Sequence, residues 1–278
     1  MYLPTGGIAF FDSGVGGLTV LHECILRGNG NLFYYYGDNQ NAPYGNLSSA
    51  RIYAYARRAL DMFHVLQPAA AVLACNTVTA VCAEQLRAQY PFPIVGAEPA
   101  VMPACAQGGK VLVLATPVTC QSEKFIRLCD RARAKYPQTQ LIIHPCPHLA
   151  GAIEQGGINA DFDVSIHIPT MPVQSIVLGC THYIYIKEQI KERFGCQVFD
   201  GNLGISTRLS TLLSSRNQGD LSTKTQRFIH TDEKIRDSQP LFSTISLKGG
   251  KTAKIHFLGA CAHINKMFYE QMFAIPYK

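Results

Sequence analysis

The sequence predicts an α/β protein made of two similar units, each built on an open, mostly parallel sheet. Two stretches carry the prediction, Ala69–Thr79 (AAAVLACNTVT) and Ser175–Ile184 (SIVLGCTHYI). Each begins as an apolar run typical of a strand buried on both faces and then reaches a cysteine, Cys75 or Cys180. Polar residues suited to opening a helix follow both cysteines. We therefore expect both thiols at the carboxyl end of a buried strand and near a helix N-terminus, where open α/β sheets bind ligands.

A common offset supports two related units. Cys180 stands 105 positions after Cys75, and the same offset relates the strand-like Ile8–Phe11 to Val113–Thr116. A third and looser match, of Leu32–Tyr36 with Pro137–Leu141, reaches only the start of the apolar Leu141–Ile143 and would need a few inserted residues. The alternative is chance similarity between buried strands.

Composition excludes several classes of protein. The 278 residues are 47% apolar and 16% charged, which suits one large or two ordinary globular domains. The net charge of +6 comes from scattered Lys and Arg residues, which indicates a mildly basic surface rather than nucleic-acid binding. No apolar run approaches a membrane span, and Met1–Gly7 lacks the basic start of a signal peptide. The ten irregularly spaced cysteines then favour reduced thiols in a cytoplasmic protein.

The first strand leads into a glycine-rich turn. Ile8–Phe11 is followed by Asp12–Gly17 (DSGVGG) and by a helical pattern at Leu18–Leu26. Thr19 stands where the dinucleotide-binding fingerprint has its third glycine, so this is not that motif. Asp12 either meets an ammonium or a catalytic group, or caps the turn.

The rest of the first unit follows the same alternation. A loop at Asn39–Gly45 comes after the strand Leu32–Tyr36, and its Pro43-Tyr44-Gly45 either covers the site or forms an ordinary turn. A long amphipathic helix, Leu47–Leu66, precedes the first cysteine strand, whose helix continues to about Tyr90.

Gly96–Ala106 is expected to cross into the second unit. The elements expected after it are strands at Lys110–Ala115, Leu141–Ile143 and Gln174–Gly179, helices at Thr119–Lys135, Thr181–Phe194 and Asn202–Ser215, a polar linker at Arg216–Lys224, and strands at Arg227–His230 and Lys254–Leu258. The closing segment is too small for a separate enzyme domain. We expect residues 1–98 with 208–278 to form a first domain carrying Cys75, and residues 99–207 to form a second carrying Cys180.

A metal site is not expected. The cluster His144-Pro145-Cys146-Pro147-His148 has a proline between potential ligands, and no CxxC partner exists elsewhere. Glu154, near the end of a short helix, reads by itself as a solvated carboxylate.

Two equivalent thiols fit proton exchange at carbon better than the usual cysteine chemistries. Cys75 has no nearby histidine base, Val81 and Ile186 stand where a cysteine phosphatase needs arginine, and redox pairs favour CxxC. A helix N-terminus lowers the pKa of a thiol, so each could serve as a base. With a substrate between the units, one thiolate removes an α-proton while the other thiol delivers a proton to the opposite face. That is a racemase or epimerase without a cofactor.

Six short motifs follow one another over roughly Ile8 to Asp200: DSGVGGL (Asp12–Leu18), NAPYG (Asn41–Gly45), ACNT (Ala74–Thr77), EPAV (Glu98–Val101), TPVTCQS (Thr116–Ser122) and GCTHY (Gly179–Tyr183). As an ordered set they resemble the aspartate/glutamate racemase family. The resemblance implies two flavodoxin-like domains with the active site between them, often in a homodimer.

The resemblance also implies residue roles. Its cysteine pair falls on Cys75 and Cys180, with Cys75 as base toward the D-form and Cys180 toward the L-form. The carboxylate assisting the second cysteine matches Glu154, through the I-E-x-G pattern ending at Gly156. Asp12 and His182 join the catalytic set. The implied substrate contacts are Asp12, Ser13, Tyr44, Gly45, Asn76, Thr77, Thr181 and His182.

The implied activity is interconversion of L- and D-glutamate, without pyridoxal phosphate or metal, to supply D-glutamate for bacterial peptidoglycan. His182 matches the glutamate branch, since aspartate racemases tend to carry a carboxylate there. An aspartate racemase, a related two-cysteine isomerase and a non-catalytic amino-acid-binding protein are the alternatives. The chain departs from the family at Ile184-Tyr185-Ile186, where Pro and an apolar residue are usual, at Gly201, where Ser is common, and after Arg216.

Overall fold

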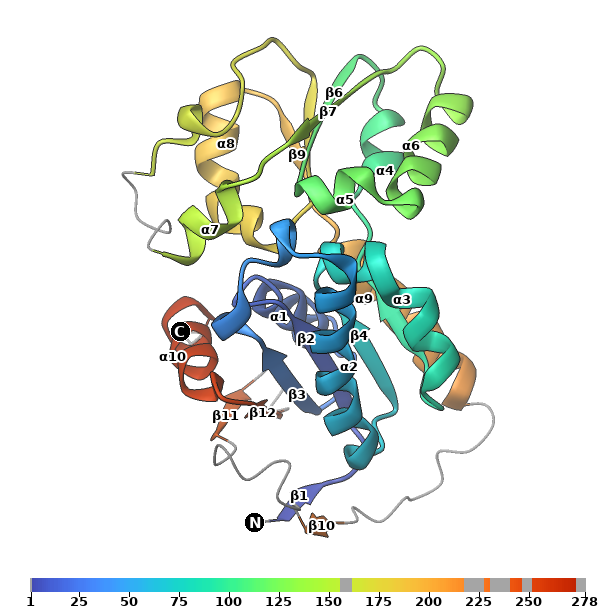
Figure 1. Ribbon diagram of the computed structural model, residues 1–278, viewed down its shortest axis with the longest axis vertical. Coiled ribbons are helices and arrows are strands. Elements are labelled where there is room, and N and C mark those ends of the chain that lie inside the picture. The colour runs from blue at the N-terminus through green and yellow to red at the C-terminus, as the bar shows by residue number, and fades with distance from the viewer. Residues whose placement is uncertain (1, 156–161, 218–227, 231–240, 247–251, 274–278) are drawn as a thin grey trace.

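The molecule consists of two α/β units stacked one above the other, as Figure 1 shows. The computed structural model describes residues 2–155, 162–217, 228–230, 241–246 and 252–273. Gly156 and residues 218–224 of the expected linker lie outside them. Of the helices in the described ranges, none combines the length and the apolar character needed to cross a lipid bilayer.

The first unit holds a six-stranded sheet in the order β11-β12-β3-β2-β4-β5. All its strands run parallel except β11, which pairs antiparallel with β12 at one edge. A separate two-stranded sheet joins β1 to β10. The elements are β1 (Tyr2–Pro4), β2 (Ile8–Asp12), α1 (Leu18–Leu26), β3 (Leu32–Gly37), η1 (Asn39–Asn41), η2 (Tyr44–Asn46), α2 (Ser49–Leu66), β4 (Ala70–Leu73), α3 (Asn76–Gln89), β5 (Ile94–Gly96), α9 (Asn202–Asn217), β10 (Phe228–His230), β11 (Leu241–Ser246), β12 (Thr252–Leu258) and α10 (Ala262–Phe273).

The second unit holds a four-stranded parallel sheet in the order β7-β6-β8-β9. Its elements are α4 (Val101–Cys105), β6 (Lys110–Ala115), α5 (Pro117–Gln121), α6 (Glu123–Lys135), β7 (Gln140–Pro145), α7 (Leu149–Glu154), η3 (Val164–Ile166), β8 (Ser175–Leu178), η4 (Thr181–Ile186), α8 (Lys187–Phe194) and β9 (Gln197–Phe199). The fold class is therefore confirmed, because each unit is an open, mostly parallel sheet flanked by helices.

The two sheets repeat one topology. The order β3-β2-β4-β5 in the first corresponds strand for strand to β7-β6-β8-β9 in the second. The register corrects one detail of the sequence argument. Leu73 and Leu178 keep the offset of 105, but their partners are Phe11 and Leu114, which stand 103 positions apart. The expected match of Phe11 with Thr116 is therefore wrong by two residues, because the loops joining the strands differ in length.

The strands carrying the cysteines are buried on both faces. Every residue of β4 and of β8 is buried, and apolar clusters lie on either side of each sheet. This burial explains the continuous apolar runs in the sequence. It also fixes each strand in its sheet, so that the cysteine that follows lies at the carboxyl edge.

The chain crosses between the units twice. The crossings are residues 97–100, between β5 and α4, and residues 200–201, between β9 and α9. They touch, because a Cβ added at Gly201 would lie 2.9 Å from the Glu98 carbonyl oxygen. Helix α9 packs on the first unit, with Ile205 and Leu209 in the same apolar cluster as residues of α1. We therefore propose a boundary near Gly201 rather than at residue 207, which would cut this helix.

Candidate active site

The two cysteines follow equivalent strands and occupy one buried region between the units. Cys75 comes two residues after β4 and caps α3, while Cys180 comes two residues after β8 and begins the 3₁₀ segment η4. Their exposed fractions are 4% and 7%. The expected α-helix after Cys180 is thus preceded by six residues of 3₁₀ helix, so only Cys75 lies directly at an α-helix N-terminus.

Cys75 is surrounded by residues of its own unit. The Ser13 hydroxyl oxygen lies 3.5 Å from Cys75 Sγ, and the backbone N–H of Val78 in α3 also faces the sulfur. Burial nevertheless raises the pKa of the Cys75 thiol to about 12, with the Asp12 charge adding to the effect and these two donors opposing it. The expected lowering of this pKa is therefore wrong, because desolvation outweighs the helix N-terminus.

Cys180 has a different set of partners. His182 Nδ1 lies 3.7 Å from Cys180 Sγ, and His182 Nε2 lies 2.5 Å from Glu154 Oε1. Glu154 ends the short helix α7, so a carboxylate that reads as solvated in the sequence is in fact part of the site.

The Glu154–His182 pair is held in its charged form. Burial alone would lower the pKa of His182, but hydrogen bonds to Cys180 and Glu154 outweigh it and hold that pKa well above its ordinary value. Burial would raise the pKa of Glu154, but His182, the Val15 N–H and the Asn39 amide together leave it lowered. The imidazolium is therefore placed to donate toward Cys180.

The glycine-rich loop after β2 brings the units together. The Val15 N–H donates to Glu154 Oε1 at 3.1 Å, and the Thr181 hydroxyl donates to Asp12 Oδ1 at 3.2 Å. A Cβ at Gly14 would meet Glu154, and one at Gly16 would lie 2.5 Å from Thr181 Oγ1. Glycine is thus required here for close approach of the second unit rather than for phosphate binding.

Asp12 lies at the centre of this contact and is fully buried. It accepts a bond from its own loop, from the Gly14 N–H at 3.0 Å, as well as the one from Thr181. Burial raises the pKa of Asp12, and the charge of His182 and the loop N–H groups only partly offset it. Asp12 therefore caps the turn and also lies close to His182 and Glu154, so both positions left open by the sequence are occupied at once.

The remaining predicted residues surround the thiols. Asn76 is buried, and its Oδ1 has no hydrogen-bond partner in the described part of the chain. The Thr77 hydroxyl contacts that of Thr116 across the two units at 3.0 Å, and Gly45 packs closely against the side chain of Thr116. The Tyr44 hydroxyl donates to Asp38 rather than to a thiol, and Cys75 is near enough for a thiolate there to help raise the pKa of Tyr44.

The structure adds residues that sequence reasoning did not select. Asn39 donates to Glu154 Oε2 at 3.4 Å, and Thr119 completes a hydroxyl cluster with Thr77 and Thr116. Tyr185 donates to the Val15 carbonyl. Asn39 follows the end of β3 by two residues, and Thr119 follows the end of β6 by four. Their position just after a strand is the signal that could have identified them from the sequence.

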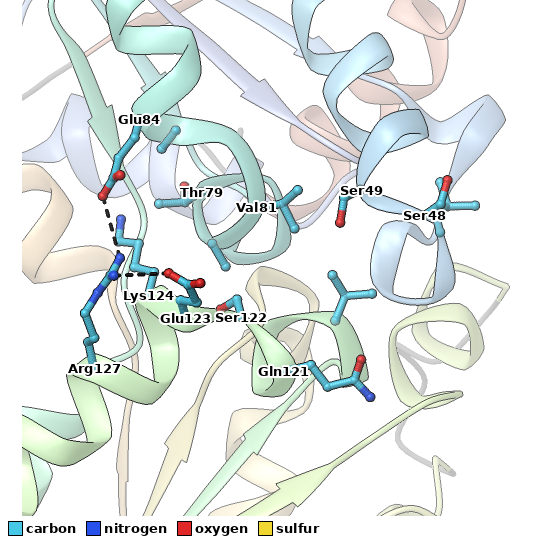
Figure 2. Close-up of a pocket in the computed structure, with 14 residues that line it drawn as sticks. Ser48, Ser49, Thr79, Val81, Glu84, Gln121, Ser122, Glu123, Lys124 and Arg127 are labelled. Carbon is cyan, nitrogen blue, oxygen red and sulfur yellow. Dashed lines mark hydrogen bonds and ion pairs between the residues drawn. The ribbon is translucent and has the colours of Figure 1, made fainter.

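A groove of about 530 Å³ is a second candidate, shown in Figure 2. It lies between α2 and α3 of the first unit and α5 and α6 of the second, and its rim carries Arg127 paired with Glu84 and Glu123. Its lining includes no cysteine or histidine. Among the described residues, no three His, Cys, Asp or Glu side chains are grouped to hold a metal ion. The thiol region, which brings two cysteines, a histidine and two carboxylates together, is therefore the stronger candidate.

Replacing Glu154 by glutamine should reduce stability in a pH-dependent way. The pKa of His182 is raised above 6.5, so the stability that charged His182 adds to the fold is complete below pH 6.5 and is lost as the pH rises through its folded-state pKa. The pKa of Glu154 is lowered from 4.5, so the stability that its carboxylate adds is lost as the pH falls through its folded-state pKa. Urea unfolding at pH 5.5 should show Glu154→Gln less stable by about 1–3 kcal/mol, and the gap should narrow at alkaline pH. A gap independent of pH would show that no charged pair forms.

Comparisons with known proteins identify one family. Residues 35–203 match the family described as Asp/Glu/Hydantoin racemase. A glutamate racemase of Clostridium botulinum is 40% identical over 222 residues, which cover 76% of this chain and 84% of that protein. One of Leptospira interrogans is 37% identical over 209 residues, covering 71% and 78%.

Solved structures give the same result for the fold. The crystal structure of a glutamate racemase from Campylobacter jejuni has a TM-score of 0.70 at 23% identity and covers 98% of this chain and 100% of that one. A Francisella tularensis glutamate racemase, crystallised in complex with D-glutamate, has a TM-score of 0.65 at 25% identity and covers 80% and 86%.

Proposed function

Since this chain belongs to the Asp/Glu/hydantoin racemase family and is an amino-acid racemase, we propose that it interconverts L- and D-glutamate by moving the α-proton between Cys75 and Cys180. One observation carries the proposal. Two thiols follow equivalent strands of two equivalent sheets and share one buried site. A pair of mirror-image substrates requires a base on each face of the α-carbon, and this duplicated arrangement supplies one from each unit.

The proposed reaction is a balanced proton transfer. One cysteine, as thiolate, takes the α-proton, so a C–H bond breaks and an S–H bond forms. The other cysteine, as thiol, gives its proton to the opposite face, and the reverse reaction exchanges their roles. The thiolate charge of Cys180 is one of the effects that raise the pKa of Cys75, so the protonation of Cys75 depends on the state of its partner.

Each thiol has its own assisting groups in this proposal. Asp12 and Ser13 lie on the Cys75 side, and His182 backed by Glu154 lies on the Cys180 side. The substrate ammonium group would bring positive charge into the site. That charge would oppose the burial and the Asp12 carboxylate that raise the pKa of Cys75, so binding itself would help to form the thiolate.

The polar groups around the thiols suit an amino acid with a second carboxylate. The unpartnered Asn76 Oδ1 can accept from the ammonium group, and the Thr77, Thr116 and Thr181 hydroxyls can donate to carboxylates. Ser13, Tyr44 and Gly45 complete the predicted contacts. Donors at the start of α3 would also stabilise negative charge as the carbanion forms, which removes the need for pyridoxal phosphate or a metal.

The wider setting is part of the same proposal. We infer a homodimer that works in the cytoplasm and supplies D-glutamate for peptidoglycan and hence for cell shape. The resemblance supports these inferences, and the ten free cysteines agree with a reducing compartment.

Heavy-water exchange tests the proposal. The protein should incorporate deuterium at the α-carbon of L- and D-glutamate and invert both, while L- and D-aspartate react at least about a hundredfold more slowly, because a side chain shorter by one methylene misplaces its carboxylate. Faster reaction with aspartate would assign an aspartate racemase. Binding of glutamate without exchange would overturn the two-thiol mechanism.

A further inference from the structure

Tyr185 joins the two units beside the proposed site. It lies three residues after His182, within Ile184-Tyr185-Ile186, where proline and an apolar residue are usual in the family. Its hydroxyl donates to the Val15 carbonyl oxygen at 2.7 Å, and its ring packs edge-on against Phe268 of α10 with centroids 5.3 Å apart. The ring belongs to the apolar clusters of both units, so the side chain spans their interface.

The backbone held by Tyr185 also binds the catalytic carboxylate. The N–H of Val15 donates to Glu154 Oε1 at 3.1 Å, while its carbonyl accepts from Tyr185 and from the Leu18 N–H at 3.1 Å. The preceding carbonyl, that of Gly14, accepts from the Tyr35 hydroxyl at 2.6 Å. One tyrosine from each unit therefore fixes the loop at neighbouring peptide groups.

The Tyr185 hydroxyl remains a donor over the whole working pH range. Burial, with the nearby charges of Asp12 and Glu154, raises its pKa well above the ordinary value. A phenol beside two carboxylates thus contributes a fixed hydrogen bond and no charge of its own.

We propose that Tyr185 is a positioning residue for the racemase reaction, whose hydroxyl holds the Gly14–Val15 segment so that the Val15 N–H stays on Glu154 and keeps the Glu154–His182 pair aimed at Cys180. The inference rests on the proposed function. It assigns Tyr185 no contact with the substrate.

Other titratable groups also face this pair. They are Asp12 at the end of β2, Tyr35 in β3, Cys180 and Tyr185 around η4, and Cys261 just before α10. Replacing Tyr185 alone leaves the other four groups in place, so a shift in the pH profile reports on the contact between Tyr185 and the Val15 carbonyl.

The test compares Tyr185→Phe with Tyr34→Phe in the full chain. Tyr34 is a matched control, because it is a buried tyrosine whose hydroxyl donates to a backbone carbonyl, that of Pro4, away from the thiols. Both variants should lower the urea midpoint by similar amounts. Only Tyr185→Phe should lower kcat/KM for glutamate, by about five- to tenfold, as expected for one lost hydrogen bond.

The pH profile separates positioning from mere stability. Without the Val15 N–H, the Glu154 carboxylate binds a proton more readily, so the acid limb of kcat/KM should move to higher pH in Tyr185→Phe alone. The protein can be labelled with ¹⁵N-histidine and the ring signals of His182 assigned with His182→Gln. In Tyr185→Phe without substrate, the step in these signals that reports protonation of Glu154 should also move to higher pH.

The outcomes distinguish this inference from the proposed function. If wild type does not racemise glutamate, the proposed function fails, and the His182 titration still decides the role of Tyr185. If Tyr185→Phe and Tyr34→Phe coincide in both the titration and the profile, the inference is overturned.

Discussion

Replacing either Cys75 or Cys180 by serine should lower the rate of glutamate inversion by about 10³–10⁴-fold. A serine hydroxyl is far less acidic than a thiol, so it can neither form the base nor return the proton at a useful rate. Each variant should be impaired most with a different enantiomer, with Cys75→Ser most affected on D-glutamate and Cys180→Ser on L-glutamate. Polarimetry of inversion and deuterium exchange by NMR, run on the same samples, would measure both effects.

Cys82→Ser provides the matched control for this pair. Cys82 is another buried thiol of α3, and it donates to the Val78 carbonyl within its own helix. A serine hydroxyl can make the same bond, so this variant should keep activity within about twofold of wild type. Substantial inversion by Cys75→Ser or Cys180→Ser would contradict the two-base mechanism, while loss of activity in Cys82→Ser would point to a general packing effect.

Gly14→Ala should reduce activity by about a hundredfold while leaving the fold in place. The added Cβ would lie 1.8 Å from Glu154 Oε1 and 3.1 Å from His182 Nε2, so the carboxylate must move away. Because the carboxylate ends a flexible side chain, the structure can yield at small cost. The relation between Glu154 and His182 cannot survive that movement, so kcat should fall, while the urea midpoint at pH 5.5 should drop no further than it does in Glu154→Gln.

Gly204→Ala is the corresponding control. Gly204 lies in the first turn of α9, and a Cβ there would meet nothing within 4 Å. Alanine is preferred to glycine inside a helix by about 0.5–1 kcal/mol, so this variant should unfold at a higher temperature with unchanged activity. Equal activities of Gly14→Ala and Gly204→Ala would show that the loop does not constrain Glu154.

The sequence predicted those parts of the site that follow from local patterns. Buried strands show as continuous apolar runs, and a residue just after such a run lies at the carboxyl edge of a sheet, which placed Cys75 and Cys180. The glycine loop and Asp12 followed from the same rule applied to β2. The proposed roles of Glu154 and His182 came from the family resemblance, because the helical pattern around Glu154 does not show which side chain its carboxylate would contact.

Contacts between the units could not be predicted in this way. Tyr185 reaches Val15 across 170 positions, and Thr77 reaches Thr116 only because two sheets face each other. The two-residue error in matching Phe11 arose because an offset assumes loops of equal length. The pKa of Cys75 was expected to fall because the helix N-terminus is local and visible, whereas burial depends on the whole assembly.

The two crossings between the units have a consequence for motion. Glu98 and Gly201 touch where the chain leaves the first unit and returns to it, so both covalent connections lie side by side. Two adjacent connections define one hinge axis and favour rotation about it, because sliding or twisting of one unit against the other would stretch one of the connections. We therefore expect a molecule to enter and leave the space between the units through one hinge rotation, and rapid-mixing experiments should resolve one opening rate shared by both mirror-image substrates.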